Sequence, residues 1–486
     1  MHTYAIRSAV LSTVGLALAL AAGAALAATY RLTDLGTLGG TSSNGIAINT
    51  SGQVTGSATT ADNSTHAFLW DGTTLQDLGT LGGTYSQGAA INASGQVTGS
   101  AYTAGGAEHA FLWNGTRMRD LGTLGGSFSA GNAINDSGQV TGYSGHAFVW
   151  DGTRMQDLGT LGGSYSAGGA INASGQVEGD SDTAGGDTHA FLWDGTRMQD
   201  LGTLGGRISH GRAINDSGQV TGYAYTAGGA TLRAFRWNGT RMQGLGTLGG
   251  RDSIGHAINA AGQVTGYSNM LDGSTHAFLW DGTSMENLGT LEGLDSYGLA
   301  INASGQVTGN SFMRDGSTHA FLWNGTRMRD LNALIDPADP LQPSVTLFEG
   351  VDINDRGQIL ANGVDSRTGE EHAYLVSPVP DSLEVAFTLR PRSLAFGEQP
   401  IGSSTTLYLW LRNRGTAPLT IQQVSLRGTD RSQFALRHRC GTALAAGAVC
   451  GVVVTFHPTS AGSKTARVRL IAGDTTRIRE LSGIAR

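Results

Sequence analysis

Cysteine, charge and long apolar runs are all scarce in this 486-residue chain. Two residues are cysteine and 14% are charged. After residue 27, no apolar stretch approaches the roughly 18 residues that a transmembrane helix needs, so we expect no membrane span in the mature chain. The motifs GxSxG, HExxH and the phosphate-binding loop are absent, so we predict no catalytic residue, no metal and no cofactor. Catalysis by residues from distant repeats stays an alternative.

The one apolar run lies at the N-terminus and is typical of a secretory signal peptide. Arg7 supplies positive charge, residues 10–26 are apolar, and residues 25–27 match the small-x-small cleavage pattern. A transmembrane anchor is the alternative, but the run is short and rich in alanine and glycine. We predict a signal peptide over residues 1–27 and a secreted, extracellular or cell-surface protein, with the periplasm as an alternative.

The two cysteines, Cys440 and Cys450, form a closely spaced pair. In an exported chain such a pair most simply forms a disulfide. A metal site would need further ligands, and the nearest candidates are His438 and His457. We predict the disulfide.

Charge is divided unevenly along the chain. Residues 28–380 carry 16 Arg against 32 Asp and Glu, a net charge of −16. Residues 381–486 carry 14 basic against 6 acidic residues, a net charge of +8. The acidic part argues against nucleic acid as a partner. The basic part can meet an acidic polysaccharide, although a merely solvated surface is the simpler interpretation.

A block of about 43 residues recurs along the first part of the chain. Its LGTLGG element, twice in altered form, starts at Leu35, Leu78, Leu121, Leu158, Leu201, Leu245, Leu288 and Leu331. Each block predicts four short strands, in AIN, GQVTG, HAFLW and RMQDLG, joined by Asp-Gly, Asn-Gly and Ser-Gly turns. The interval from Leu121 to Leu158 is only 37 residues and lacks residues before His146, which predicts a tolerant surface loop there.

The two ends of the array complement each other. AIN-type, GQV-type and HAF-type strands each occur eight times, but no fourth strand follows the last block. A spare fourth strand lies at residues 30–36, and its pairing with the last block would remove an exposed edge. We therefore predict an all-β chain whose residues 28–380 form an eight-bladed β-propeller closed by its N-terminal strand. An open β-solenoid is the alternative.

The motifs HAFLW, LGTLGG and AINxSGQVTG resemble the HAF family of extracellular repeats over residues 30–380, approximately. The ending LNALIDP…DINDRGQI…HAYLVSP resembles the way such arrays finish. The resemblance implies an extracellular repeat protein and brings no ligand or activity with it.

Short alternating strands fill the C-terminal part and predict an immunoglobulin-like β-sandwich over residues 381–486. The segment SLAFGEQPIGSSTTLYLWLRNRGTAPLTI, the cysteine pair and VTFHPTSAGSKTARVRLI resemble the Hydin-like immunoglobulin fold of choice-of-anchor D surface proteins. The resemblance covers about residues 384–486 and implies a secreted spacer or interaction module.

Recurring residues and departures from the repeat have different interpretations. The recurring tryptophans are expected in the core between blades rather than stacked on sugars. The recurring histidines are expected to be hydrogen-bonded strand ends rather than metal ligands. Asp180, Asp182 and Asp187 could bind calcium, but their spacing does not match a complete calcium-binding loop.

The positions that vary after LGTLGG are expected near one mouth of the ring. Ordinary sequence variation at the surface is one interpretation of these positions. We predict instead that they bind a ligand, through Arg207, His210, Arg212, Arg251, Asp252, His256, Asp295 and Tyr297.

These features predict a secreted or surface binding protein of unknown ligand, without catalysis, whose partner is a polysaccharide or a surface protein. The alternatives are a secreted carbohydrate-active enzyme with acidic residues at the propeller mouth and a purely structural surface protein.

Overall fold

The computed structural model describes residues 29–379, 387–391, 393–414, 418–472 and 475–486. The predicted signal peptide, residues 1–27, lies outside these residues. The described part is all-β: besides strands it contains two 3-10 turns, η1 (Asn332–Leu334) and η2 (Arg431–Gln433), and no α-helix. Consequently, none of its helices is long and apolar enough to cross a membrane.

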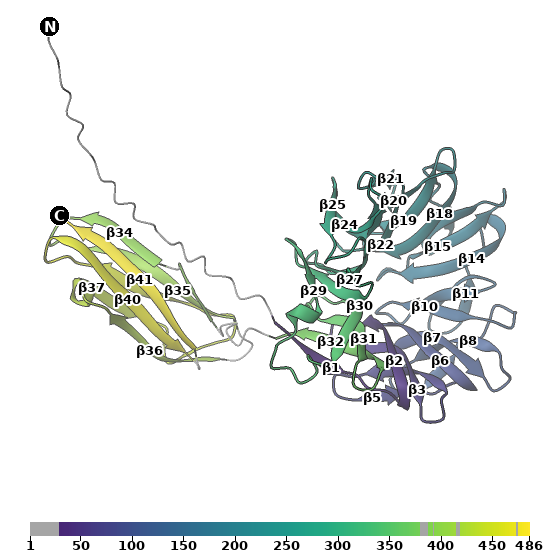
Figure 1. The fold of residues 1–486 in the computed structure, drawn as a ribbon, viewed down its shortest axis with the longest axis horizontal. Helices are drawn as coiled ribbons and strands as arrows, with labels where there is room; N and C mark the ends of the chain where they lie inside the picture. The colour runs from purple at the N-terminus through teal and green to yellow at the C-terminus, as the bar shows by residue number, and fades with distance from the viewer. Residues whose placement is uncertain (1–28, 380–386, 392, 415–417, 473–474) are drawn as a thin grey trace, which may run out of the picture.

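Residues 30–378 form six four-stranded antiparallel sheets and one eight-stranded sheet, in a propeller-like arrangement (Figure 1). The eight-stranded sheet consists of two four-stranded antiparallel units, which a single parallel pair, Thr65 with Tyr85, joins. The segment therefore comprises eight four-stranded units. Units 1 to 4 are β2–β5 (Gly39–Ile48, Val54–Thr60, Thr65–Trp70, Leu75–Asp77), β6–β9 (Gly82–Ile91, Val97–Thr103, Glu108–Trp113, Met118–Asp120), β10–β13 (Ala130–Ile134, Val140–Ser144, His146–Trp150, Met155–Asp157) and β14–β17 (Gly162–Ile171, Val177–Thr183, Thr188–Trp193, Met198–Asp200).

Units 5 to 7 are β18–β21 (Gly205–Ile214, Val220–Thr226, Leu232–Trp237, Met242–Gly244), β22–β25 (Ser253–Ile258, Val264–Asn269, Thr275–Trp280, Met285–Gly289) and β26–β29 (Ser296–Ile301, Val307–Phe312, Thr318–Trp323, Met328–Asp330). Unit 8 combines β30–β32 (Val345–Ile353, Ile359–Asp365, Glu370–Pro378) with β1 (Tyr30–Asp34). In this unit β1 pairs antiparallel with β32, from Tyr30 opposite Pro378 to Asp34 opposite Tyr374.

Local turn chemistry explains why these segments form hairpins. In unit 2, the Asn92 side-chain oxygen accepts hydrogen bonds from the amides of Ser94 and Gln96, and Gly95 takes φ +80°. The Asn114-Gly115 turn, with Gly115 at φ +95°, then joins β8 to β9. Asparagine and glycine are the residues that such tight turns require. The predicted hairpins are present in the structure.

The hydrophobic core lies between neighbouring units. One cluster joins Ala67 and Leu69 of β4 to Val97, Phe111 and Trp113 of unit 2. The other recurring tryptophans are buried in equivalent clusters. The predicted place of the tryptophans in the core between units is therefore confirmed.

A row of asparagines links the first strands of all the units. The Nδ2 atom of each asparagine donates a hydrogen bond of 3.0–3.2 Å to the backbone carbonyl of its counterpart in the next unit, in the order Asn49, Asn92, Asn135, Asn172, Asn215, Asn259, Asn302, Asn354 and back to Asn49. These side chains are buried. Each unit is thus held to the next by the same residue that shapes its own turn.

The C-terminal part is a sandwich of two sheets around one core. Its strands are β33–β36 (Phe387–Arg390, Ser393–Gln399, Thr405–Asn413, Leu419–Arg427) and β37–β41 (Phe434–His438, Ala443–Leu444, Val449–Phe456, Gly462–Ala472, Thr475–Ala485). One sheet has the order β33-β35-β39-β37 and the other β34-β41-β40-β36-β38. The predicted disulfide between Cys440 and Cys450 is present.

Candidate functional site: a cavity at the short hairpin

Unit 3 differs from the other units in the hairpin between its second and third strands. In unit 4 this hairpin extends until Asp182 lies opposite Thr188, but in unit 3 it turns at Gly145, with Ser144 opposite His146. The first strand of unit 3 is also short, with five residues in β10 against ten in β14 and six in β22. The missing residues therefore remove the cover from the segment that precedes β10.

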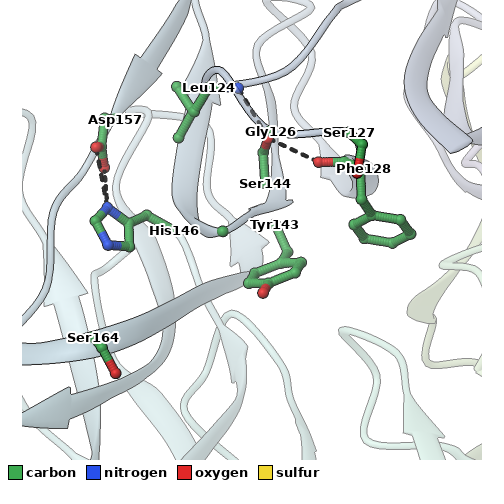
Figure 2. Close-up of a pocket in the computed structure, with 10 residues that line it drawn as sticks. Leu124, Gly126, Ser127, Phe128, Tyr143, Ser144, His146, Asp157 and Ser164 are labelled. Carbon is green, nitrogen blue, oxygen red and sulfur yellow. Dashed lines mark hydrogen bonds and ion pairs between the residues drawn. The ribbon is translucent and has the colours of Figure 1, made fainter. Parts of the chain in front are cut away.

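The glycines of that segment show how much space is freed. A Cβ on Gly82 would lie 3.1 Å from Ala104, and a Cβ on Gly162 would lie 3.0 Å from Ala184, because the long hairpins pack there. Around Gly125 of unit 3 no atom lies within 4 Å of the same position. The vacated space is a cavity of about 470 Å³, lined by Leu124, Gly126, Ser127, Phe128, Tyr143, Ser144, Gly145, His146, Asp157 and Ser164 (Figure 2).

Aromatic rings form one wall of the cavity. The Phe128 and Tyr143 rings lie 5.9 Å apart, and Tyr143 lies 5.5 Å from Tyr165 of unit 4. Phe128 and Tyr165 are 38% and 39% exposed. Such a row presents flat apolar surface together with phenol groups that form hydrogen bonds.

A histidine and an aspartate form the opposite side. His146 Nδ1 lies 3.1 Å from the Asp157 carboxylate, as Figure 2 shows. The side chain of His146 is 36% exposed, against 18–20% for its counterparts His66, His109 and His189. The short hairpin thus uncovers an imidazole that the neighbouring units cover.

The contact of His146 with Asp157 recurs in other units, so Nδ1 of this histidine has a structural partner. All seven recurring histidines hydrogen-bond through Nδ1 to a carboxylate or amide oxygen of a fourth strand, as predicted for strand ends. The nearby Ser144 hydroxyl accepts a hydrogen bond from the Leu124 amide and donates one to the Phe128 carbonyl, each 2.9 Å long. It is therefore occupied in holding the cavity wall, and the arrangement suits binding better than nucleophilic catalysis.

Three of the predicted site residues lie close together in units 5 and 6: His210, Arg212 and His256. His210 Nδ1 lies 2.8 Å from Asp180, whose other oxygen accepts a hydrogen bond from the Gly211 amide. The His210 ring packs 5.0 Å from Tyr223, and the Arg212 guanidinium lies over the same tyrosine at 5.6 Å. Burial, followed by the charge of Arg212, lowers the pKa of the third residue, His256, to about 4, so its imidazole is neutral at pH 7.

A second row of ring contacts lies in units 6 and 7. His256 packs 5.6 Å from Tyr267, and Tyr267 lies 4.9 Å from the predicted site residue Tyr297. Tyr297 in turn lies 6.5 Å from Phe312.

Two other predicted site residues, Arg207 and Arg251, contact neighbouring hairpins and are not part of the cluster of His210, Arg212 and His256. Arg207 forms an ion pair of 2.6 Å with Asp187. Arg251 hydrogen-bonds to the Ala230 carbonyl and lies 3.8 Å from Asp252.

The two acidic members of the predicted set are also engaged with backbone. Asp252 accepts a hydrogen bond from the Leu232 amide, and Asp295 accepts one of 2.7 Å from the Thr275 amide. Both hold the third strand of the preceding unit. As for the calcium interpretation, no group of three potential metal ligands occurs among the residues that the structure describes.

Sequence reasoning missed Glu178, which stands where six other units have threonine in GQVTG. It is fully buried, and neither carboxylate oxygen has a hydrogen bond of normal geometry within the described residues. Burial, and next the charge of Asp180, raises its pKa to about 8, against the opposing effects of Arg212 and the Ala170 amide. The departure from GQVTG to GQVEG was the signal that could have found it.

Comparison with known proteins identifies one part of the chain. Residues 386–482 match the sequence family described as HYDIN/CFA65/VesB-like, Ig-like domain. The C-terminal sandwich is Ig-like. This match confirms the predicted Hydin-like segment. No curated protein matches the chain.

Similarities to solved structures are distant. The ASH/PapD-like domain of human CEP192 is 20% identical over 21% of this chain and 85% of its own, with a TM-score of 0.17. The secreted serine protease VesC from Vibrio cholerae is 15% identical over 41% of this chain and 49% of its own, with a TM-score of 0.19. TolB from Acinetobacter baumannii is 9% identical over 68% of this chain and 65% of its own, with a TM-score of 0.33. No functional conclusion follows from these similarities.

Proposed function

We propose that the protein is a secreted or surface-exposed, non-catalytic binding protein whose repeat domain binds a glycan in the cavity of unit 3. The observation that carries this proposal is the 470 Å³ space that the short hairpin opens beside Phe128, Tyr143 and the exposed His146. The size lies in the range of small-molecule sites, and apolar walls with a few polar groups are what such sites require.

The chemistry of the walls favours a sugar. A pyranose ring has an apolar face of C–H groups and a rim of hydroxyls. The face can stack on Tyr143 or Phe128, and the rim can hydrogen-bond to His146, Asp157 and the backbone of Gly126. The aromatic row through Tyr165 extends this surface along the units and suits several consecutive sugar residues.

The proposal includes the finer description of the fold. We propose that residues 28–380 form an eight-bladed propeller of HAF-type repeats closed by the N-terminal strand. The pairing of β1 with β32 and the cyclic order of the asparagine hydrogen bonds support it. A signal peptide over residues 1–27 and a choice-of-anchor D role for the sandwich complete the proposal.

The decisive experiment measures retention of purified residues 28–486 on a panel of immobilised polysaccharides, followed by calorimetric titration with oligosaccharides of the retained type. We expect Tyr143→Ala to weaken binding about tenfold, because it removes one aromatic stacking surface. Tyr102→Ala is the matched control, since Tyr102 is an exposed aromatic residue that packs on Tyr85, outside the cavity.

A second variant tests the cavity itself. Replacing Gly145 with residues 182–188 of unit 4 rebuilds the long hairpin, and we expect it to fill the space and abolish binding while the fold is retained. Undiminished affinity in this variant would overturn the proposal. Release of free sugar during the incubation, lost in His146→Ala, would support the alternative of a carbohydrate-active enzyme.

A further inference from the structure

The Ig-like sandwich exposes two large aromatic side chains on the outer face of one sheet. Tyr408 is 51% and Trp410 is 53% exposed, and both project from β35 on the side opposite the core residues Leu409 and Leu411. Their rings lie 6.0 Å apart and within 15° of parallel. Exposed aromatic residues that are held in a common orientation are unusual in a domain of this size and suggest an interaction surface.

The indole of Trp410 lies over a glycine of the neighbouring strand. Gly451 of β39 lies opposite Trp410 in the register. A Cβ at this position would meet the indole ring at 3.4 Å, an ordinary van der Waals contact. The ring therefore lies beside the backbone of β39.

Arginines surround the two rings on the same face. Arg390 of β33 lies opposite Trp410, and Arg412 is two residues further along β35. On the other side, Val453 lies opposite both Tyr408 and Arg437 of β37. All three arginines are exposed, and none of them forms an ion pair within the described residues.

The acidic residues of the described sandwich lie elsewhere. Glu398 of β34 contacts Arg486, and Glu480 of β41 contacts Arg467. Asp430, near η2, accepts a hydrogen bond from the Thr465 amide. Within the described part of this sheet, the outer face therefore carries cationic charge that its own carboxylates do not neutralise.

We infer that the aromatic–basic face, formed by Tyr408, Trp410, Arg390, Arg412 and Arg437, binds an anionic polysaccharide. Sugar rings stack on the two aromatic side chains, and carboxylate groups along the polymer contact the guanidinium groups on either side. Charge complementarity selects this occupant, because a neutral glycan would leave three cations unmatched. This face is separate from the cavity of unit 3 and does not depend on glycan binding there.

The test uses the chain from residue 28 to 486 and polygalacturonate as the probe, with neutral dextran of similar length for comparison. We expect no dextran binding that depends on Trp410, and saturable, salt-sensitive binding of polygalacturonate. Trp410→Ala should weaken it about tenfold or more, and Arg412→Ala several-fold. Arg427→Ala is the matched control, because Arg427 is exposed on β36 of the other sheet.

The outcomes separate the inference from its alternatives. Circular dichroism of Trp410→Ala should be unchanged, since the side chain is half exposed. Equal losses in Arg412→Ala and Arg427→Ala would mean unspecific charge attraction and overturn the inference. Two other results would overturn it as well. One is dextran binding that Trp410→Ala weakens as much as it weakens polygalacturonate binding. The other is concentration-dependent self-association that Trp410→Ala abolishes, in the absence of polygalacturonate binding.

Discussion

At the scale of single residues, Glu178 shows how one change in a repeat alters its surroundings. In units 1 and 2 the equivalent Thr55 and Thr98 donate a buried hydrogen bond to the carbonyl of the unit's own phenylalanine. Glu178 instead extends between Gly169 and Gly211, where a Cβ would lie 2.5 and 2.0 Å from its two carboxylate oxygens. A side chain at either glycine would therefore force this carboxyl group to shift from its present position.

The raised pKa of Glu178 makes stability depend on pH. The pKa of Glu178 in the folded protein, about 8, lies above the ordinary value of 4.5, so between pH 4.5 and pH 8 the folded protein retains a proton that the unfolded chain loses. The stability associated with this protonated carboxyl group is fully present below pH 4.5 and is lost as the pH rises towards 8. Glu178→Gln removes this titrating group. The unfolding free energy of Glu178→Gln minus that of the wild type should therefore be about 3 kcal/mol larger at pH 8 than at pH 5. Urea unfolding at both pH values measures this difference.

A control variant separates charge from packing. Glu178→Thr restores the residue found in other units, so it should also abolish the pH dependence while changing the stability at pH 5 by a different amount. If the difference in unfolding free energy between the wild type and Glu178→Gln is the same at pH 5 and pH 8, this carboxyl group does not retain a proton in the folded protein.

At the scale of elements, the asparagine that ends each first strand combines two tasks. The Asn215 side-chain oxygen accepts hydrogen bonds from the Ser217 and Gln219 amides and so shapes the turn. Its nitrogen donates to the Asn259 carbonyl of the next unit. One side chain therefore fixes both the hairpin and the position of its neighbour.

Replacing this asparagine should disturb both connections. Asn215→Ala leaves the buried Asn259 carbonyl and two turn amides without their partners, and each lost partner costs about 1 kcal/mol or more. We expect a loss of about 2–4 kcal/mol, measured by chemical unfolding. Asn238→Ala is the control, because Asn238 forms a similar turn through the Thr240 and Arg241 amides but is exposed. A loss no larger than that of the control would contradict the role between units.

Local chemistry also decides what the sequence could reveal. The strands and turns followed from the AIN, GQVTG and Asn-Gly patterns, because such turns depend on adjacent residues. The interaction of His210 with Asp180 joins two units and did not follow from spacing within one repeat. The cavity was missed because the short interval before His146 only indicated a tolerant loop. That the short interval opens a cavity can be seen only in the structure, where the long hairpins of other units fill the corresponding space.

At the scale of the whole molecule, the N-terminal strand links residues that are far apart in the sequence. Tyr30 and Leu32 of β1 are buried in the core of the last units. The Leu32 amide donates a hydrogen bond to Asp339, and Asp34 lies 2.9 Å from His372. Through this strand, the beginning of the repeat domain completes its final unit.

Removal of this strand should destabilise the repeat domain and leave the sandwich unaffected. A chain that starts at Thr37 loses the burial of Tyr30 and Leu32 and exposes the edge of β32, so we expect a loss of about 3 kcal/mol or more and a tendency to associate through that edge. Differential scanning calorimetry should show a lower melting transition for the repeat domain and an unchanged one for the sandwich. A synthetic peptide of residues 28–38, added in excess, should restore the first transition, because it binds the folded form alone. If the truncated chain melts like the full one, β1 does not hold the last unit in place.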